Sequence, residues 1–346
     1  MAKIAVIGYG NIGKFVAARA PAYGHEVALV VSRRSIENGQ GEILVGPDSF
    51  SSFTNHLTEM IRHCVNAKIT HAMIAIPSGG DGMIELGYAL TLIEAGIKVV
   101  TAGKSALANQ FLQLQEYLRR IKYDAACGGG TMILPYLKNH LYVNASHPFV
   151  VTMVINGTLN FAQSRVRDGI SAEQIVQEAL KLGFAEPAAD GKKLTPLDMY
   201  DGEFGDIQRK MSIVCNTLML PLIDNPVTQN VFRVARFTES QRARVMAGNS
   251  NLRYLVRFCT RRQDLEFFAD VEDHGGHVIE SVGELFVASG FVELKGALLK
   301  WVPDHVGNAC HVVQNGETVH CVGQGAGPVP TVGTMYSNLH SFLDPT

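Results

Sequence analysis

The sequence lacks several features that define whole classes of protein. No apolar run in its 346 residues reaches the roughly 18–20 residues that a membrane-spanning helix needs. Its N-terminus shows no basic segment followed by an apolar core and a cleavage site, so we expect no signal peptide. Its six cysteines are scattered without CxxC spacing, which argues against a zinc site and favours free thiols over disulfides. Together these absences predict a cytoplasmic protein.

The positive and negative charges of the sequence nearly balance. Its formal net charge is −2, so we expect neither nucleic acid nor an anionic membrane as a partner. Apolar residues make up 47% of the chain and charged residues 18%, as in an ordinary globular enzyme. At roughly 100–200 residues per domain, the length predicts two domains.

The first half of the chain alternates between short apolar runs and helical patterns. Residues 3–7 and 26–31 read as buried strands, and residues 11–23 between them as a helix that stops near Gly24. Further strands are predicted at 72–76 and 98–101, with helices at 83–95 and 109–121. This alternation predicts an α/β fold with an N-terminal Rossmann-type, doubly wound parallel sheet.

The second half reads as an α+β domain with a mixed sheet. A strand at 149–155 precedes helices at 159–168, 172–182 and 206–220, the second of which opens with a Ser171–Gln174 capping box. Later strands are predicted at 254–260, 265–271, 309–314 and 318–322, the last two joined by an Asn315-Gly316 hairpin turn. A closing helix is predicted at 331–343. We therefore expect a dinucleotide-binding domain at 1–148, a substrate and dimerisation domain at 149–322, and a C-terminal segment at 323–346 that returns to the first domain.

A glycine motif lies between the first predicted strand and helix. Gly8, Gly10 and Gly13 form a G-x-G-x-x-G pattern, with Asn11 and Ile12 inside it. The first glycine permits a tight turn, the second lets the backbone approach a pyrophosphate, and the third lets the helix pack on the strand. Glycines also mark ordinary turns, but this position indicates a dinucleotide site.

The end of the second predicted strand distinguishes NAD from NADP. An acid there would hydrogen-bond the ribose 2′-hydroxyl, whereas this chain has Ser32, Arg33, Arg34 and Ser35. Two guanidinium groups suit a 2′-phosphate, which favours NADP and leaves NAD possible. A solvated basic turn is the alternative interpretation.

An acid and a lysine share one face of a predicted helix. Asp206 and Lys210 are four residues apart, and the helix that follows them is apolar, so the pair is predicted to face a cleft. The stretch 190–205 before them reads as irregular. Glu186, which precedes Pro187 in a loop, could bind an ammonium group. The alternatives are a surface salt bridge and a solvated loop charge.

Six short segments, in order along nearly the whole chain, resemble the homoserine dehydrogenase family. Each one is modest alone, but together they are specific. The segments are Val99-Val-Thr-Ala-Gly-Lys104, Gly128-Gly-Gly130, Gly157-Thr-Leu-Asn-Phe161, Gly183-Phe-Ala-Glu-Pro187, Gly205-Asp-Ile-Gln-Arg-Lys210 and Gly323-Gln-Gly-Ala-Gly327.

The resemblance implies a role for each matching residue. Lys210 and Lys104 would be the catalytic lysines, with Asp206 beside Lys210. The substrate site would also contain Asp201, with Glu186 holding the substrate amine. Gly157, Thr158 and Asn160 would form a floor between cofactor and substrate. Gly325 and Gly327 would form a turn near the cofactor. The backbone carbonyls of Cys127, Gly129 and Thr131 would bind a monovalent cation.

The resemblance implies an NADP-preferring enzyme that interconverts L-aspartate 4-semialdehyde and L-homoserine as a homodimer. Three features depart from the family pattern: Gly103 replaces an asparagine, Ala188-Ala189 replaces Asp-Pro, and the stretch 186–206 is longer. These changes leave open a relative that acts on another small carbonyl or hydroxy compound. A cofactor-binding sensor would keep the glycine loop without needing Lys210 and Asp206, and a structural protein would need neither.

Overall fold

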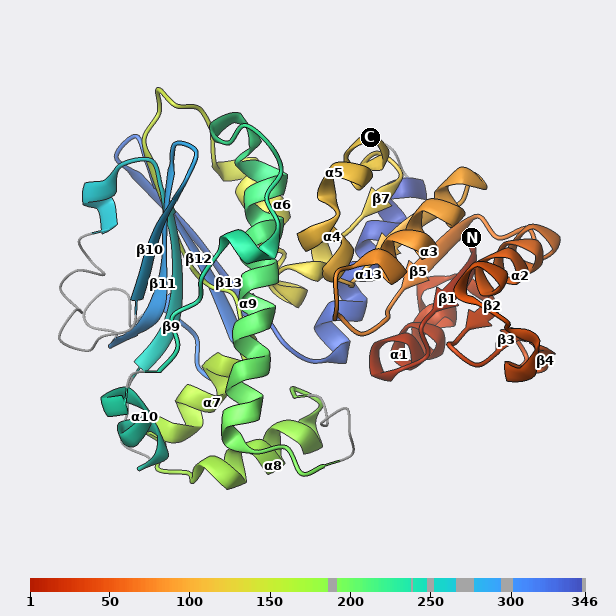
Figure 1. Cartoon of the computed structure of the whole chain (residues 1–346), viewed down its shortest axis with the longest axis horizontal. Helices are drawn as coiled ribbons and strands as arrows, with labels where there is room; N and C mark the ends of the chain where they lie inside the picture. The colour runs from red at the N-terminus through yellow and green to blue at the C-terminus, as the bar shows by residue number, and fades with distance from the viewer. Residues whose placement is uncertain (186–191, 238, 248–251, 266–276, 294–300, 344–346) are drawn as a thin grey trace. The chain divides into compact units, whose positions relative to one another are not determined.

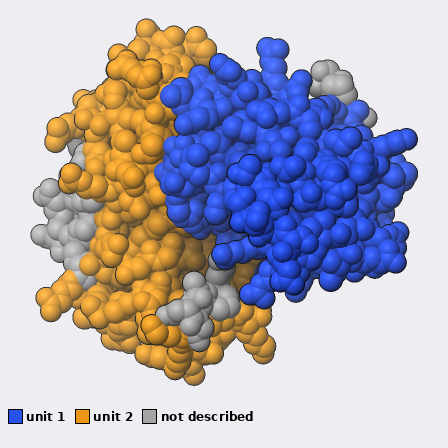
Figure 2. All heavy atoms as spheres, turned by 45° about the vertical axis from the view of Figure 1, so that its right-hand side comes forward, with its two compact units in different colours: residues 1–126, 331–346 blue, residues 127–330 orange. Residues whose placement is uncertain are grey.

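The computed structural model describes residues 1–185, 192–237, 239–247, 252–265, 277–293 and 301–343. The chain divides into two compact units, which Figure 2 distinguishes by colour. The first unit contains residues 1–126 and 331–346, and the second contains residues 127–330. The expected division of roles among 1–148, 149–322 and 323–346 stays a prediction.

The first unit contains a seven-stranded sheet in the order β4-β3-β2-β1-β5-β6-β7. The five strands from β2 to β7 in this order are parallel, whereas β3 and β4 add an antiparallel edge. The chain reverses direction across the sheet at β1, which is where a doubly wound sheet binds its ligand. The strands are β1 (Lys3–Ile7), β2 (Glu26–Val31), β3 (Ile36–Asn38), β4 (Ile43–Val45), β5 (His71–Ile74), β6 (Lys98–Thr101) and β7 (Ile121–Lys122).

The helices of the first unit bury the faces of this sheet. One core cluster joins Ile4 and Val6 of β1 to Val16 of α1 and to Met335 and Leu339 of the C-terminal helix α13 (Pro328–Leu343). The last residues of the chain therefore pack on its first strand. The other helices are α1 (Asn11–Arg19), α2 (Phe53–Asn66), α3 (Met83–Glu94), α4 (Ser105–Asn109) and α5 (Phe111–Leu114).

The prediction of a single helix at 109–121 is wrong. Helix α4 ends at Asn109, α5 ends at Leu114, and a 3₁₀ turn at Gln115–Tyr117 leads to β7. Gln110 between the helices has φ −125° and ψ 25°, outside the helical region, so the chain bends there.

The second unit contains a six-stranded sheet in the order β10-β11-β9-β8-β12-β13. The sequence predicts a mixed sheet, and the pairings found are antiparallel throughout. Asn315 and Gly316 both have positive φ, as the predicted hairpin turn requires. The predicted strand 265–271 lies almost wholly outside the described residues. The strands are β8 (Phe149–Val154), β9 (Leu252–Cys259), β10 (His277–Val282), β11 (Leu285–Glu293), β12 (Gly307–Gln314) and β13 (Glu317–Gln324).

Helices of the second unit lie along one face of this sheet (Figure 1). Helix α7 contacts β9 and β12, and Phe204 of α9 packs against Tyr254 and Phe291 of the sheet. The Ser171 capping box and the left-handed Gly183 bound α8 as predicted. The helices are α6 (Ile133–His140), α7 (Gly157–Arg167), α8 (Ala172–Leu182), α9 (Pro196–Leu218) and α10 (Glu239–Met246).

Helix α9 begins ten residues earlier than the sequence interpretation placed it. Thr195 and Asp198 form a capping box and Pro196 occupies the first helical position, so the supposedly irregular stretch is helical from Pro196 onward. Asp201, Glu203, Asp206 and Lys210 are therefore carried on one rigid element.

Candidate functional site

The glycine loop joins β1 to α1 in the form that a dinucleotide needs. Gly8 has φ 92°, and a Cβ there would lie 2.6 Å from the carbonyl oxygen of Ala75. A Cβ on Gly13 would overlap the carbonyl oxygen of Gly8, whereas a Cβ on Gly10 would meet nothing within 4 Å. The first and third glycines thus serve close backbone packing, and the second leaves open space beside the loop.

The N-terminus of α1 is available to an anion. Gly10 is its N-cap residue, no side chain caps it, and its first turn carries no acid. Asn11 is exposed and Ile12 is half-buried, so the first backbone N–H groups are not covered by an apolar core. Open space beside Gly10 and an uncapped helix start fit the pyrophosphate of a dinucleotide.

The turn after β2 contains an acid that the sequence interpretation overlooked. Arg33 and Arg34 are exposed, and the Ser32 hydroxyl accepts hydrogen bonds from the backbone N–H groups of Arg34 and Ser35 at 3.1 and 2.9 Å. The Ser35 hydroxyl donates to Oε1 of Glu37 on β3 at 2.6 Å. Because β3 runs antiparallel to β2, it brings this carboxylate back beside the turn.

Lys210 is buried in the second unit and paired with Asp206. Its Nζ lies 2.6 Å from Oδ2 of Asp206 and donates to the carbonyl oxygen of Ile155 at 2.7 Å. Only 6% of the lysine is exposed. An ammonium has three N–H donors, so among the contacts of the described residues one donor is left for a ligand oxygen.

Asn156 connects this pair to a second carboxylate. Its Nδ2 donates to Oε2 of Glu203 at 2.6 Å and to Oδ2 of Asp206 at 2.9 Å. Its Oδ1 accepts from the backbone N–H of Leu159 and so caps α7. The sequence interpretation used neither Asn156 nor Glu203. Two sequence features could have identified them. Asn156 directly follows a strand, where an asparagine can cap the next helix, and Glu203 lies one helical turn before Asp206.

The pKa of Lys210 is raised above its usual value. Burial by itself acts in the opposite direction, because it disfavours the charged form. The charge and hydrogen bond of Asp206, with smaller contributions from Cys127 and Glu203, outweigh burial. Lys210 is therefore an ammonium at neutral pH, able to stabilise negative charge and to donate a proton.

The predicted floor residues lie at the start of α7 and are buried. Thr158 donates through its hydroxyl to the carbonyl oxygen of Phe184 at 2.7 Å. Asn160 donates to the carbonyl oxygens of Pro303, His305 and Gly307, so its amide holds that loop in place.

Four predicted glycines lie where turns of the second unit approach one another closely. A Cβ on Gly157 would lie 2.9 Å from the backbone nitrogen of Ala326, and one on Gly129 would lie 2.8 Å from the carbonyl oxygen of Gly325. A Cβ on Gly327 would meet the ring of Phe184 at 3.5 Å. The tertiary structure therefore gathers turns that lie far apart in the sequence.

The predicted cation turn has an unusual backbone. Gly128, Gly129 and Met132 all have positive φ, and the backbone N–H of Thr131 donates to the carbonyl of Gly128. Cys127 is buried. Within the described residues, no group of three or more His, Cys, Asp or Glu could hold a metal ion. Binding of a monovalent cation by carbonyls at Cys127, Gly129 and Thr131 stays a prediction.

The remaining predicted residues are Asp201, Lys104 and Glu186. Asp201 forms an ion pair with Arg236 at 2.9 Å, and both side chains are more than half exposed. Lys104 belongs to the first unit, where it is half-buried at the end of β6 and at the start of α4. Glu186 lies outside the described residues.

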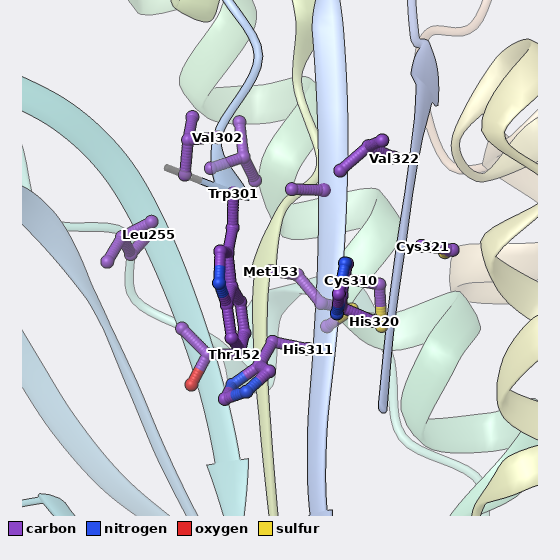
Figure 3. A pocket seen from close by; sticks show the side chains of 12 residues that line it. Thr152, Met153, Leu255, Trp301, Val302, Cys310, His311, His320, Cys321 and Val322 are labelled. Atoms are coloured by element: carbon purple, nitrogen blue, oxygen red, sulfur yellow. The ribbon is translucent and has the colours of Figure 1, made fainter. Parts of the chain in front are cut away.

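A pocket in the second sheet contains none of the predicted site residues. Trp301 packs against two neighbouring histidines there, 3.6 Å from the ring of His311 and 4.8 Å from that of His320, measured between centroids (Figure 3). Within the described part of the chain, no helix combines the length and apolarity needed to cross a bilayer.

The family model for homoserine dehydrogenase matches residues 141–339, which is more than half of the chain. The chain belongs to the homoserine dehydrogenase family. It is 26% identical over 251 residues to an NAD(+)-dependent homoserine dehydrogenase of Pseudomonas canavaninivorans, covering 69% of this chain and 66% of that protein. It is 24% identical over 197 residues to a homoserine dehydrogenase of Sulfurisphaera tokodaii, covering 53% and 60%. The chain thus spans slightly less than two thirds of these curated relatives.

Solved structures of the homoserine dehydrogenase family share the fold. The homoserine dehydrogenase of Thermoplasma acidophilum has a TM-score of 0.67 at 19% identity, with 99% of each chain covered. A hyperthermophilic archaeal homoserine dehydrogenase in complex with NADPH has a TM-score of 0.60 at 18% identity, with 100% of this chain and 99% of the other covered. The predicted fold class and family resemblance are confirmed.

Proposed function

We propose that the protein is an NAD(P)-dependent oxidoreductase that interconverts L-aspartate 4-semialdehyde and L-homoserine. The observation that carries this proposal is the buried Lys210 ammonium, held by Asp206 and the Ile155 carbonyl, with one N–H donor unused among the residues that the structure describes. Family membership and the glycine loop of the first unit support it. A solvated salt bridge would not need a buried lysine anchored on both sides.

The residues of this chain would act on the oxygen of the substrate carbonyl. A bound nicotinamide would supply the hydride in the reductive direction. Lys210 would stabilise the negative charge that develops on that oxygen and deliver a proton to it from Nζ. Asp206 keeps the lysine charged beforehand, and the Ile155 carbonyl fixes its direction.

The family resemblance assigns further roles, which we propose for this chain. Lys104 would be the second catalytic lysine, and Glu186 would bind the substrate amine. Asp201 would belong to the substrate site. Gly157, Thr158 and Asn160 would shape its floor, and Gly325 and Gly327 would close near the cofactor.

We propose that NADP(H) binds more tightly than NAD(H). Arg33 and Arg34 are exposed in the turn after β2, where two guanidinium groups could bind a 2′-phosphate. Glu37 opposes this preference, because its carboxylate faces the same turn through Ser35. The balance between two cations and one anion would set the cofactor preference.

We further propose a homodimer, formed through the substrate and dimerisation domain expected at 149–322. Light scattering at micromolar concentration should return twice the chain mass. A monomer mass would refute this assembly.

One experiment tests the function directly. NADPH oxidation should be followed with L-aspartate 4-semialdehyde and a panel of other small aldehydes and keto acids, beside a cofactor-binding titration. We expect turnover with L-aspartate 4-semialdehyde and its reversal with L-homoserine and NADP⁺. Turnover with another member of the panel alone would overturn the substrate, and cofactor binding without any turnover would overturn the activity.

A further inference from the structure

A buried glutamate lies in the first unit beside Lys104. Glu85 sits in the first turn of α3 and is only 4% exposed. Its Oε1 accepts a hydrogen bond from the hydroxyl of Thr101 at 3.0 Å, and its Oε2 accepts one from the backbone N–H of Ala106 at 3.1 Å. The carboxylate therefore bridges the end of β6 and the start of α4, the two elements that flank Lys104.

The glycine before Lys104 is shaped by this carboxylate. A Cβ on Gly103 would overlap Oε1 of Glu85, so the acid occupies the space that any other side chain would need. The backbone N–H of Gly103 donates to the Thr101 hydroxyl at 2.9 Å, and that hydroxyl donates to Glu85. Gly103 and Glu85 thus form a matched pair, in which the missing side chain of one makes room for the charge of the other.

The loop before α3 is locked against the same segment. A Cβ on Gly82 would lie 2.5 Å from the carbonyl oxygen of Ser105, and Nε2 of Gln110 donates to the carbonyl of Asp81 at 2.8 Å. These contacts join the two segments without involving Glu85. The carboxylate is consequently an additional, polar constraint placed directly beside Lys104.

The pKa of the Glu85 carboxyl is raised above its usual value. Burial, which raises it, outweighs the Ala106 N–H, the Thr101 hydroxyl and the positive charge of Lys104, which lower it. A carboxyl that is buried only for packing would be replaced by an apolar residue at little cost. Here its oxygens accept hydrogen bonds from both sides of the loop and interact with the lysine between them.

We propose that Glu85 is a positioning residue for Lys104, with Gly103 as the space that admits its carboxylate. The proposal deepens the proposed function, since it rests on the role assigned there to Lys104. Glu85 fixes the direction of the loop from which Lys104 projects.

The first test measures turnover. Glu85→Ala and Gly103→Ala should each lower kcat about ten- to a hundredfold, because small displacements of a catalytic group have effects of that order. Cofactor affinity should stay within about threefold, since the glycine loop is untouched. In the double variant Glu85→Ala/Gly103→Ala the overlap is gone. Its fold loss of kcat should therefore be smaller than the product of the two single fold losses. Glu94→Gln, an exposed acid on the same helix, is the matched control.

The outcomes separate positioning from general stability. A folded Glu85→Ala protein with wild-type kcat would overturn the proposal, and so would strictly additive effects in the double variant. If kcat, cofactor affinity and melting temperature all fall together, Glu85 has only a structural role and the proposal is overturned. Glu85→Gln keeps the shape and an acceptor oxygen, and it should recover much of the stability but less of kcat.

A second readout does not depend on turnover. Labelling of Lys104 by an amine-reactive anhydride, followed by mass spectrometry of its peptide, reports how accessible the lysine is. In Glu85→Ala, Lys104 should be labelled about twofold faster or more, because its segment loses the hydrogen bonds that Thr101 and Ala106 donate to the carboxylate. Unchanged labelling would refute the link between the two residues. If the wild-type enzyme lacks activity but this shift appears, the proposed function fails and the positioning of Lys104 stands.

Discussion

Lys210 keeps its charge in surroundings that oppose it. It is almost fully buried, and Asp206 and the Ile155 carbonyl take two of its donors. A surface i,i+4 pair would contribute only about 0–1 kcal/mol. Burial makes this pair different, because removing either partner would leave the other as a buried charge without its ion pair.

Replacing Lys210 should separate chemistry from stability. Lys210→Met keeps most of the volume but loses the ammonium, so kcat should fall about a hundredfold or more while KM changes little. Lys210→Arg keeps the charge but cannot readily release a proton, and should remain impaired. Steady-state kinetics and thermal melts check this. Near wild-type kcat for a folded Lys210→Met protein would return the residue to a salt-bridge role.

The turn after β2 predicts how cofactor preference can be shifted in both directions. Arg33→Ala with Arg34→Ala should weaken NADP(H) binding by about 1.5–3 kcal/mol, as for lost charge-assisted hydrogen bonds, and leave NAD(H) nearly unchanged. Glu37→Gln should strengthen NADP(H) binding, because it removes a negative charge facing the same turn. Fluorescence titration with both cofactors measures the effect. Equal changes for both cofactors would contradict it.

At the scale of elements, α9 is the scaffold of the candidate site. The Thr195 capping box starts the helix ten residues before Asp206, which places Glu203 one turn before that aspartate. Asn156, at the junction of β8 and α7, binds both carboxylates and also caps its own helix. The end of a strand and the middle of a helix are thereby held in one arrangement.

Two cap substitutions test this arrangement. Asn156→Ala and Thr195→Ala each remove a helix cap, and each should lower stability by about 1 kcal/mol. Asn156→Ala also frees the carboxylates beside Lys210, so its kcat should fall about tenfold or more through misplaced groups. Thr195→Ala should keep wild-type kcat. Denaturant titration and kinetics on both variants decide, and identical kinetics would rule out a role for Asn156 beyond capping.

At the scale of the whole molecule, each compact unit contains a histidine whose pKa is lowered. His71 lies on β5 beside Phe342 and is 5% exposed, whereas His311 of β12 is half-buried and packs against Trp301. Burial is the main cause that lowers the pKa of each to about 4, and neighbouring positive groups contribute. The Nε2 atom of each has no partner within the described residues, as expected for neutral rings.

These histidines predict the direction of acid sensitivity. Their pKa values are lower in the folded than in the unfolded chain, so unfolding takes up protons below pH about 6.5. Stability should be complete above that pH and fall as the pH drops toward about 4, by about 3 kcal/mol at most for His71. Urea titrations at several pH values measure it. His71→Phe should flatten the slope, and an unchanged slope in that variant would exclude His71 as the source.

Much of the fold and part of the candidate site could be predicted from the sequence by itself. The strands β1, β2 and β6, the glycine turn, the Ser171 capping box and the Asn315-Gly316 hairpin follow from patterns within a few residues of one another. Asp206 and Lys210 share a face for the same reason, because helical geometry alone brings residues four apart together.

Only the tertiary structure decided which distant groups complete these local patterns. Asn156 meets Glu203 and Asp206 across 47 and 50 residues, and Glu85 meets Ala106 across 21. Periodicity and capping signals report on neighbours along the chain, whereas these contacts depend on which strands and helices pack together. Lys210 becomes buried beside Asp206, and the Glu85 carboxylate beside Gly103, only when those elements meet.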